Sequence, residues 1–282
     1  MNWSKNLDYF APVALSIGIS LGFSQIYLSS TGFSTYVNLS RFGLPYQLML
    51  TAFSVALGLV GVSVFYYLLT RRKDFETRVV AALVFAPTTA VIVILVSQAV
   101  LLSVAKEAYS YLVAFIIIVS IFIAVFSTVF ILADIFSRRS RNVLYIIYGS
   151  ILGGFLGLIF PSMMLTVILW SLALFDAFMM RTALKRIAVD LQQDRGPISK
   201  FSYTGEYFQL GLGEFLFYST LPAHVNAYFD GVTLVLTVMM IFVGLLLNLR
   251  MLKGREYIAG IPLPVLLGTM PMIIKALVIG FL

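Results

Sequence analysis

Two acidic residues lie inside long apolar stretches of the sequence, where a charged side chain calls for a functional explanation. Asp176 lies five residues before Arg181, and Glu214 lies about seven residues into an apolar run that begins near residue 207. At about 1.5 Å per helical residue, the two acids are roughly 8 Å and 10 Å from helix ends on the same side. An ionisable group in hydrocarbon is costly unless it is paired, neutralised or hydrated. The matched depths therefore predict a carboxylate pair.

Two facing carboxyl groups can share one proton. The ionised group then activates a water molecule, while the protonated group polarises a carbonyl. The same pair could instead bind protons or cations in a transporter or a leak channel. A third alternative is a pair of separately neutral, packed acids in a catalytically silent protein that binds transmembrane helices. The two acids alone leave these three uses open.

The residues around the acids are irregular for transmembrane helices. Gly211 and Gly213 precede Glu214, where they weaken a helix and let water or an extended backbone approach the carboxylate. Pro262 and Pro264 open the last apolar run, where they leave carbonyls without intrahelical donors and favour an extended entry. With Asp176, these make three irregularities at one depth on three late spans, which indicates a functional site.

These residues resemble a known family of membrane proteases. Gly211-Leu212-Gly213-Glu214, with the aromatic run that follows it, is similar to the Gly-Leu-Gly-Asp signature of presenilins and their archaeal homologues. Phe175-Asp176 resembles the Tyr-Asp pair of that family, and Ile261 to Pro264 resembles its Pro-Ala-Leu-Pro motif. The resemblance implies an intramembrane aspartyl protease that cleaves single-span membrane proteins and needs no cofactor or metal.

The resemblance also implies roles for individual residues. The catalytic residues would be Asp176 and Glu214. The residues that shape the site or bind substrate would be Phe175, Gly211, Leu212, Gly213, Pro262, Leu263 and Pro264.

The sequence departs from the family pattern at several of these positions. Phe175 lacks the hydroxyl of the usual tyrosine, and only Leu263 and Pro264 match the proline motif. Glu214 stands where the family has aspartate, and its extra methylene moves the carboxylate by up to roughly 1.5 Å. A misplacement of about 1 Å can lower a reaction rate about a hundredfold. The substitution predicts reduced or abolished activity.

The composition excludes a water-soluble globule. Of the 282 residues, 61% are hydrophobic and 11% are charged, and the mean hydropathy is +1.01, against about 45–50% and about 25% in soluble domains. This balance predicts an all-α, multi-pass protein of the cell membrane. The chain contains no cysteine, which excludes disulfides and thiol catalysis.

Apolar runs of spanning length occur nine times. The predicted transmembrane helices are 10–29, 45–69, 79–104, 109–136, 143–160, 162–181, 207–225, 231–250 and 261–281. We expect the first span to stay in the protein as a signal anchor and not to be cleaved as a signal peptide. The chain then divides into an N-terminal six-helix part (1–181), a cytoplasmic loop (182–206) and a C-terminal three-helix part (207–282).

Basic residues predict the orientation. With alternating sides, sixteen of the 19 lysine and arginine residues fall on the N-terminal side and two on the other. The positive-inside rule then places the N-terminus in the cytoplasm and the C-terminus outside. The formal charge of +7 is spread over short loops, so the expected partner is the anionic lipid surface and not a nucleic acid.

Two further segments carry structural predictions. Gly149, Gly153 and Gly157 lie four residues apart, a spacing typical of close helix packing. The stretch from Ser199 to Phe208 is rich in aromatic residues, and we expect it to be mobile without substrate and able to order as an extended strand. A substrate strand could add to its edge.

Three isolated ionisable residues have simpler explanations. Lys275 lies seven residues from the C-terminus, so we expect it to snorkel to the outer interface. His224, the single histidine, is expected to be an interfacial polar residue. Asp134 precedes Arg138 by four residues, which suits an ion pair along a helix.

Overall fold

The computed structural model describes residues 3–29, 43–70, 74–104, 109–132, 137–182, 202–204, 209–252 and 260–279. This part of the chain is 94% helical. Its nine helices are α1 (Trp3–Ser29), α3 (Leu44–Thr70), α4 (Asp74–Val104), α5 (Tyr109–Leu132), α6 (Arg138–Ile159), α7 (Ser162–Thr182), α9 (Leu212–Tyr228), α10 (Gly231–Leu252) and α11 (Pro262–Ile279). Each predicted apolar segment overlaps one of these helices.

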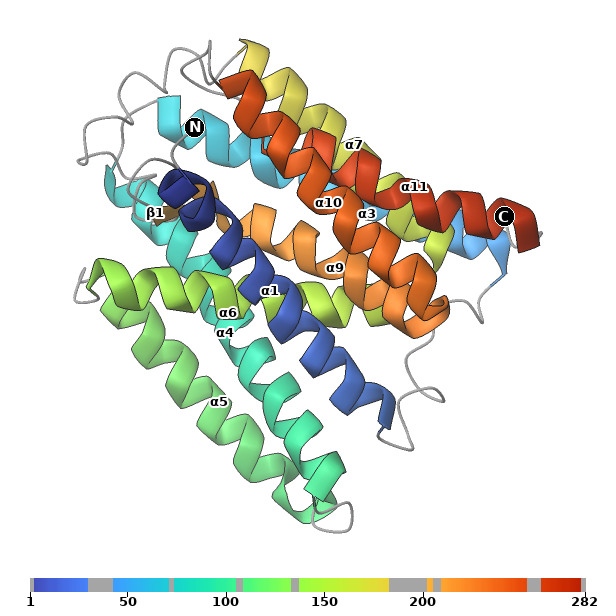
Figure 1. Ribbon diagram of the computed structural model, residues 1–282. Coiled ribbons are helices and arrows are strands. Elements are labelled where there is room, and N and C mark those ends of the chain that lie inside the picture. The colour runs from blue at the N-terminus through green and yellow to red at the C-terminus, as the bar shows by residue number, and fades with distance from the viewer. Residues whose placement is uncertain are drawn as a thin grey trace.

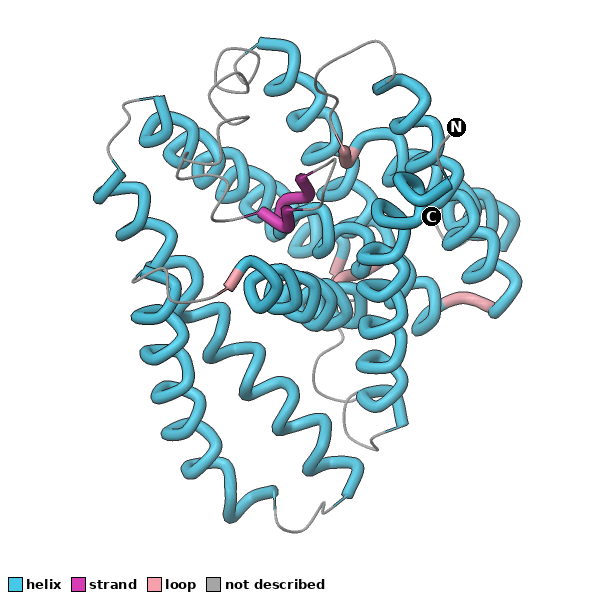
Figure 2. Tube along the Cα trace, turned by 60° about the vertical axis from the view of Figure 1, so that its left-hand side comes forward, coloured by secondary structure: helices cyan, strands magenta, loops and turns pink. Residues whose placement is uncertain are grey.

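A two-stranded antiparallel hairpin precedes α9. Strand β1 (Ser202–Thr204) pairs with β2 (Gln209–Gly211), with Tyr203 opposite Leu210 (Figure 2). The ability of the Ser199 to Phe208 stretch to form an extended strand is confirmed for β1, whose partner is the chain itself. Its expected mobility without substrate stays a prediction. The rest of that stretch lies outside the described residues.

The prediction of a helix from residue 207 is wrong by five residues. Residues 209–211 are in β2 and α9 begins at Leu212. The hydrogen-bonding partner of β2 is a separate strand, so hydropathy along the chain could not reveal it. The two glycines before Glu214 belong to a strand-to-helix junction and do not weaken the interior of a helix.

Helices α6 and α9 form the centre of the molecule, with α1 packed across both (Figure 1). The predicted close packing of the three α6 glycines is confirmed. A Cβ atom at Gly149 would lie 2.5 Å from the Cβ of Phe215, and one at Gly157 would lie 2.4 Å from the carbonyl oxygen of Thr220. Only glycine lets the two backbones approach this closely.

Buried serines join the same three helices. The Ser16 hydroxyl on α1 lies 2.6 Å from that of Ser219 on α9 and 2.9 Å from that of Ser150 on α6. Ser20 donates a hydrogen bond of 2.8 Å to the carbonyl oxygen of Ser219. All four residues are fully buried. We call these four residues the serine cluster, and their hydrogen bonds fix the register of α1 against α6 and α9.

The other helices surround this centre on two sides. Helices α4 and α5 pack mainly against each other and project as a pair, while α7, α10 and α11 lie along the other side, with α3 against α7 (Figures 1 and 2). Helix α5 exposes several large side chains, among them Phe115 and Phe122. Such a surface is expected where lipid is the solvent.

Four helices in the described residues are long and apolar enough to cross a membrane. They are Tyr9–Ser29, Leu112–Phe130, Arg138–Ile159 and Gly231–Met251. Three further apolar helices are shorter, at Ala86–Leu101, Ser162–Phe178 and Pro262–Val278. The chain is thus a helical protein with the composition and helix lengths of a membrane protein.

Candidate active site

Asp176 lies on α7, six residues before the helix ends at Thr182, and its side chain is half-buried. Its carboxylate faces the start of α11, because the backbone N–H of Ile261 donates a hydrogen bond of 3.3 Å to Asp176 Oδ2. The hydrogen bond connects two elements that are 85 residues apart in the sequence. Asp176 is therefore held by backbone at the entrance to the last helix.

Glu214 lies in the first turn of α9. Gly211 is the last residue of β2 and also the N-cap of α9, with φ −71° and ψ 155°. Its backbone N–H donates to the Glu214 carboxylate, which is how a glutamate at the third helical position completes a helix N-terminus. The β-hairpin and the helix start together place this acid.

The Glu214 carboxylate lies directly against Gly260. A Cβ atom on Gly260 would be 2.7 Å from Cδ and from Oε2 of Glu214, so only glycine leaves room for the carboxylate. Atom Oε2 of Glu214 is buried, and no residue in the described part of the chain donates to it. A buried acceptor without a donor is costly.

The two acids meet at a single peptide unit, which joins Gly260 to Ile261. Its N–H donates to Asp176, while the Cα of Gly260 lies against Glu214. Its carbonyl oxygen accepts two hydrogen bonds of 2.8 Å, from the Tyr218 hydroxyl and from Asn248 Nδ2. The acids are also close enough to interact electrostatically with each other. The two predicted catalytic residues are therefore brought together.

The predicted shaping residues lie at different distances from this point. Leu212 packs against the hydrophobic cluster that α1, α4 and α6 form, and Gly213 is exposed. Phe175 is half-buried next to Asp176 on α7. Pro264 packs on α10, where a Cβ atom at Gly244 would lie 2.4 Å from its Cα. Direct contacts with the acids come from Gly211, which donates to Glu214, from Gly260, and from Ile261, the first residue of the proline motif.

Three residues of the site have no role in the sequence prediction. Tyr218 follows Glu214 by one helical turn, Asn248 is a buried amide in the apolar α10, and Gly260 closely precedes the prolines. An uncharged polar residue within an apolar run is the signal that could have identified Asn248. Tyr218 lies in the aromatic run quoted above, and its hydroxyl is close enough to both acids to interact with them electrostatically.

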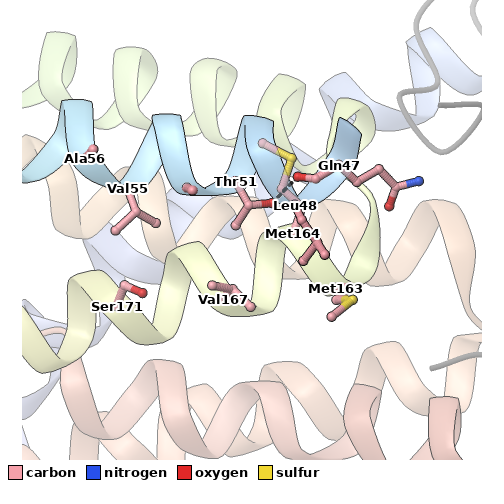
Figure 3. A pocket seen from close by; sticks show the side chains of 10 residues that line it. Gln47, Leu48, Thr51, Val55, Ala56, Met163, Met164, Val167 and Ser171 are labelled. Atoms are coloured by element: carbon pink, nitrogen blue, oxygen red, sulfur yellow. Dashed lines mark hydrogen bonds between the residues drawn. The ribbon is translucent and has the colours of Figure 1, made fainter. Parts of the chain in front are cut away.

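A separate cavity of about 450 Å³ lies between α3 and α7 (Figure 3). Its walls are mostly apolar and include Thr51, Val55, Met164 and Val167. Neither acid lines this cavity. It is a feature of the helix surface and not the site where the carboxylates meet.

The prediction that His224 is interfacial is wrong, because the side chain is fully buried. Its Nδ1 lies 2.8 Å from the carbonyl oxygen of Gly157, which can only accept, so Nδ1 carries the hydrogen. Its Nε2 therefore accepts from the Ser162 hydroxyl at 2.9 Å. The histidine joins the end of α6 to the start of α7, and two satisfied nitrogens explain how it tolerates burial.

Lys275 on α11 is partly exposed and forms an ion pair of 2.9 Å with Asp230, which precedes α10. The sequence does not predict this partner. Both side chains are partly exposed, which is compatible with the expected snorkelling of Lys275. Asp134 lies outside the described residues. No group of three or more histidine, cysteine or acidic residues in the described ranges could hold a metal ion.

Comparison with known proteins does not identify the chain. No protein-family model matches the sequence, and no curated protein matches it. The assignment of a function therefore depends on the chemistry of the site and on the sequence motifs around it.

Proposed function

We propose that the chain is an intramembrane protease that hydrolyses peptide bonds within transmembrane helices, using Asp176 and Glu214 as its carboxylate pair. The observation that carries the proposal is that both acids contact one peptide unit, Gly260–Ile261. A site that already surrounds a peptide unit with two carboxyl groups, a phenol and an amide has the groups that peptide hydrolysis needs. The likeness to presenilins in the same residues supports this assignment.

The chemistry uses one ionised and one protonated carboxyl group. The ionised group accepts a proton from water as the water oxygen attacks the scissile carbonyl carbon, and the protonated group donates to the carbonyl oxygen. The tetrahedral intermediate then collapses, the C–N bond breaks, and a carboxyl proton passes to the leaving amine. No cofactor takes part, and the substrates are single-span membrane proteins.

The topology belongs to the same proposal. All nine helices cross the membrane, with the N-terminus in the cytoplasm and the C-terminus outside. The cytoplasmic ends of α7, α9 and α11 then carry the acids and the Gly260–Ile261 peptide. The site opens toward the cytoplasm, from which water enters.

The test is cleavage of a single-span reporter in liposomes. Glu214→Asp retracts the carboxylate by one methylene from Gly260, and we expect activity to rise by about one to three decades. Glu214→Gln and Asp176→Asn should abolish cleavage, because an amide cannot exchange the shared proton.

Two outcomes would contradict the proposal. If the chain and Glu214→Asp are equally silent while the reporter is still retained, the protein is a silent binder of transmembrane helices. Proton or cation flux through the liposomes that both acids support, without cleavage, would assign the pair to a transporter or a leak channel.

A further inference from the structure

Asn248 is a buried amide close to the end of α10. Its side chain is 3% exposed, and its Nδ2 donates to the carbonyl oxygen of Gly260, twelve residues further along the chain. The neighbours of Asn248 on α10 are leucines. An amide in this environment needs a specific reason, because burying it costs free energy that a leucine would not.

The oxygen of this amide makes no hydrogen bond within the described part of the chain. Asn248 Oδ1 is buried, and no donor in the described part of the chain reaches it. An unsatisfied buried acceptor lowers stability. A buried asparagine with one hydrogen bond, to Gly260, therefore stabilises the fold less than a packed apolar side chain would. This favours a role for Asn248 in the site over a role in folding.

The peptide unit between Gly260 and Ile261 connects Asn248 to Asp176, because its C=O accepts from Asn248 and its N–H donates to Asp176. A trans peptide is planar, and its C=O and N–H point in opposite directions. Two donors, Asn248 Nδ2 and the Tyr218 hydroxyl, fix the direction of the carbonyl. They thereby fix the direction of the Ile261 N–H, which holds Asp176 Oδ2.

We propose that Asn248 is a positioning residue, which acts through the Gly260–Ile261 peptide to hold the Asp176 carboxylate in place relative to Glu214. This inference rests on the proposed function and deepens it. Asn248 does not touch the substrate or the reacting water. Tyr218 shares the same carbonyl, so the two donors act as a unit.

The test uses Asn248→Leu, which keeps the side-chain size and removes the donor. Thr237→Val is the matched control, because Thr237 is a fully buried residue of the same helix whose hydroxyl has no partner among the described residues. Asn248→His restores a donor at the same bond distance from the backbone. Each substitution is made both in the parent protein and in the Glu214→Asp variant.

Two measurements are compared across these variants. We expect Asn248→Leu to lower kcat of reporter cleavage about 10- to 100-fold with KM within about twofold, while Asn248→His recovers part of kcat. Amide hydrogen exchange at Ile261 should become at least about tenfold faster in Asn248→Leu, because the N–H is no longer aimed at Asp176. Thr237→Val should change neither quantity.

Either of two results overturns the inference. One is an Ile261 exchange rate in Asn248→Leu equal to that of Thr237→Val, and the other is a faster exchange with an unchanged kcat. Absence of cleavage in every form, Glu214→Asp included, overturns the proposed function instead. The exchange rate then still decides whether Asn248 holds the peptide.

Discussion

At the scale of single residues, the contact between Glu214 and Gly260 determines where the carboxylate can lie. The whole carboxyl group sits within 2.8 Å of the position that a Cβ atom on Gly260 would take. A glutamate side chain can rotate away from such an obstacle, whereas the peptide it faces is held by three hydrogen bonds. Any added bulk at residue 260 therefore moves the acid before it moves the backbone.

Gly260→Ala should reduce cleavage about a hundredfold with little change in thermal stability, because the displaced group is the end of a flexible side chain. The measurement is reporter cleavage beside thermal unfolding in detergent. Gly231→Ala is the control, since nothing lies within 4 Å of a Cβ atom there. The loss should be smaller in Glu214→Asp, whose carboxylate is retracted. An equal loss in both backgrounds would refute the steric explanation.

Asp230 should make stability depend on pH. Hydrogen bonds from the Thr233 side chain and from Lys275 hold the pKa of its carboxyl well below the ordinary value. Its stabilising effect is thus complete above the unfolded pKa of about 4 and is lost as pH falls through the lower folded pKa.

The measurement is the unfolding midpoint as a function of pH in detergent. At pH 7, Asp230→Asn should lower the midpoint by about 2–4 °C, and the difference from the parent should shrink in acid. A difference that stays constant down to pH 2 would contradict this assignment.

At the scale of elements, the contact between α6 and α9 depends on small residues. A Cβ atom at Gly153 would lie 2.5 Å from the carbonyl oxygen of Leu216 and 2.8 Å from the Cβ of Ser219. Both obstacles belong to a helix and cannot rotate away, unlike the carboxylate beside Gly260. The two helices would have to separate.

Gly153→Ala should therefore destabilise the protein by about 1–3 kcal/mol, the usual cost of overpacking. Gly22→Ala on α1, with nothing within 4 Å of its Cβ position, should be neutral or stabilising by up to about 1 kcal/mol. Thermal unfolding of the two variants provides the comparison. Equal midpoints would show that α6 and α9 tolerate a wider spacing.

The sequence predicts the elements better than the contacts between them. Long apolar runs identify all nine described helices, and the spacing of the α6 glycines predicts their close packing. Local hydropathy wrongly predicts a helix at residues 209–211, because it cannot reveal their strand partner, Ser202 to Thr204.

In the site too, the sequence predicts some residues and not the contacts between them. Asp176 and Glu214 stand out as charges among apolar residues, a signal that needs no structure. Asn248 and Gly260 are uncharged, and their importance appears only when α10, the start of α11 and α9 come together. Tyr218 could be mistaken for an ordinary core aromatic until its hydroxyl is seen to donate to Gly260.

At the scale of the whole molecule, the charge distribution predicts which helix ends face the cytoplasm. The chain has no cysteine, so single cysteines can report on each side without further substitution. Ser103→Cys, near the end of α4, should react with a membrane-impermeant maleimide on intact cells. Ser140→Cys, in the first turn of α6, should react only after permeabilisation. The reverse pattern would invert the topology and place the acids near the outer face.

The serine cluster has a consequence for how the protein is made. A nascent chain emerges with its N-terminus first, so Ser16 and Ser20 enter the membrane about 200 residues before Ser219 is synthesised. Until then their hydroxyls can bond only within α1 or to other early helices, as serines in apolar helices do by turning back to their own carbonyls. The hydrogen bonds that hold α1 against α9 can therefore form only after the ribosome has synthesised α9. Truncation before α9 should therefore leave α1 inserted without its hydrogen bonds to Ser219, and exposed to membrane quality control.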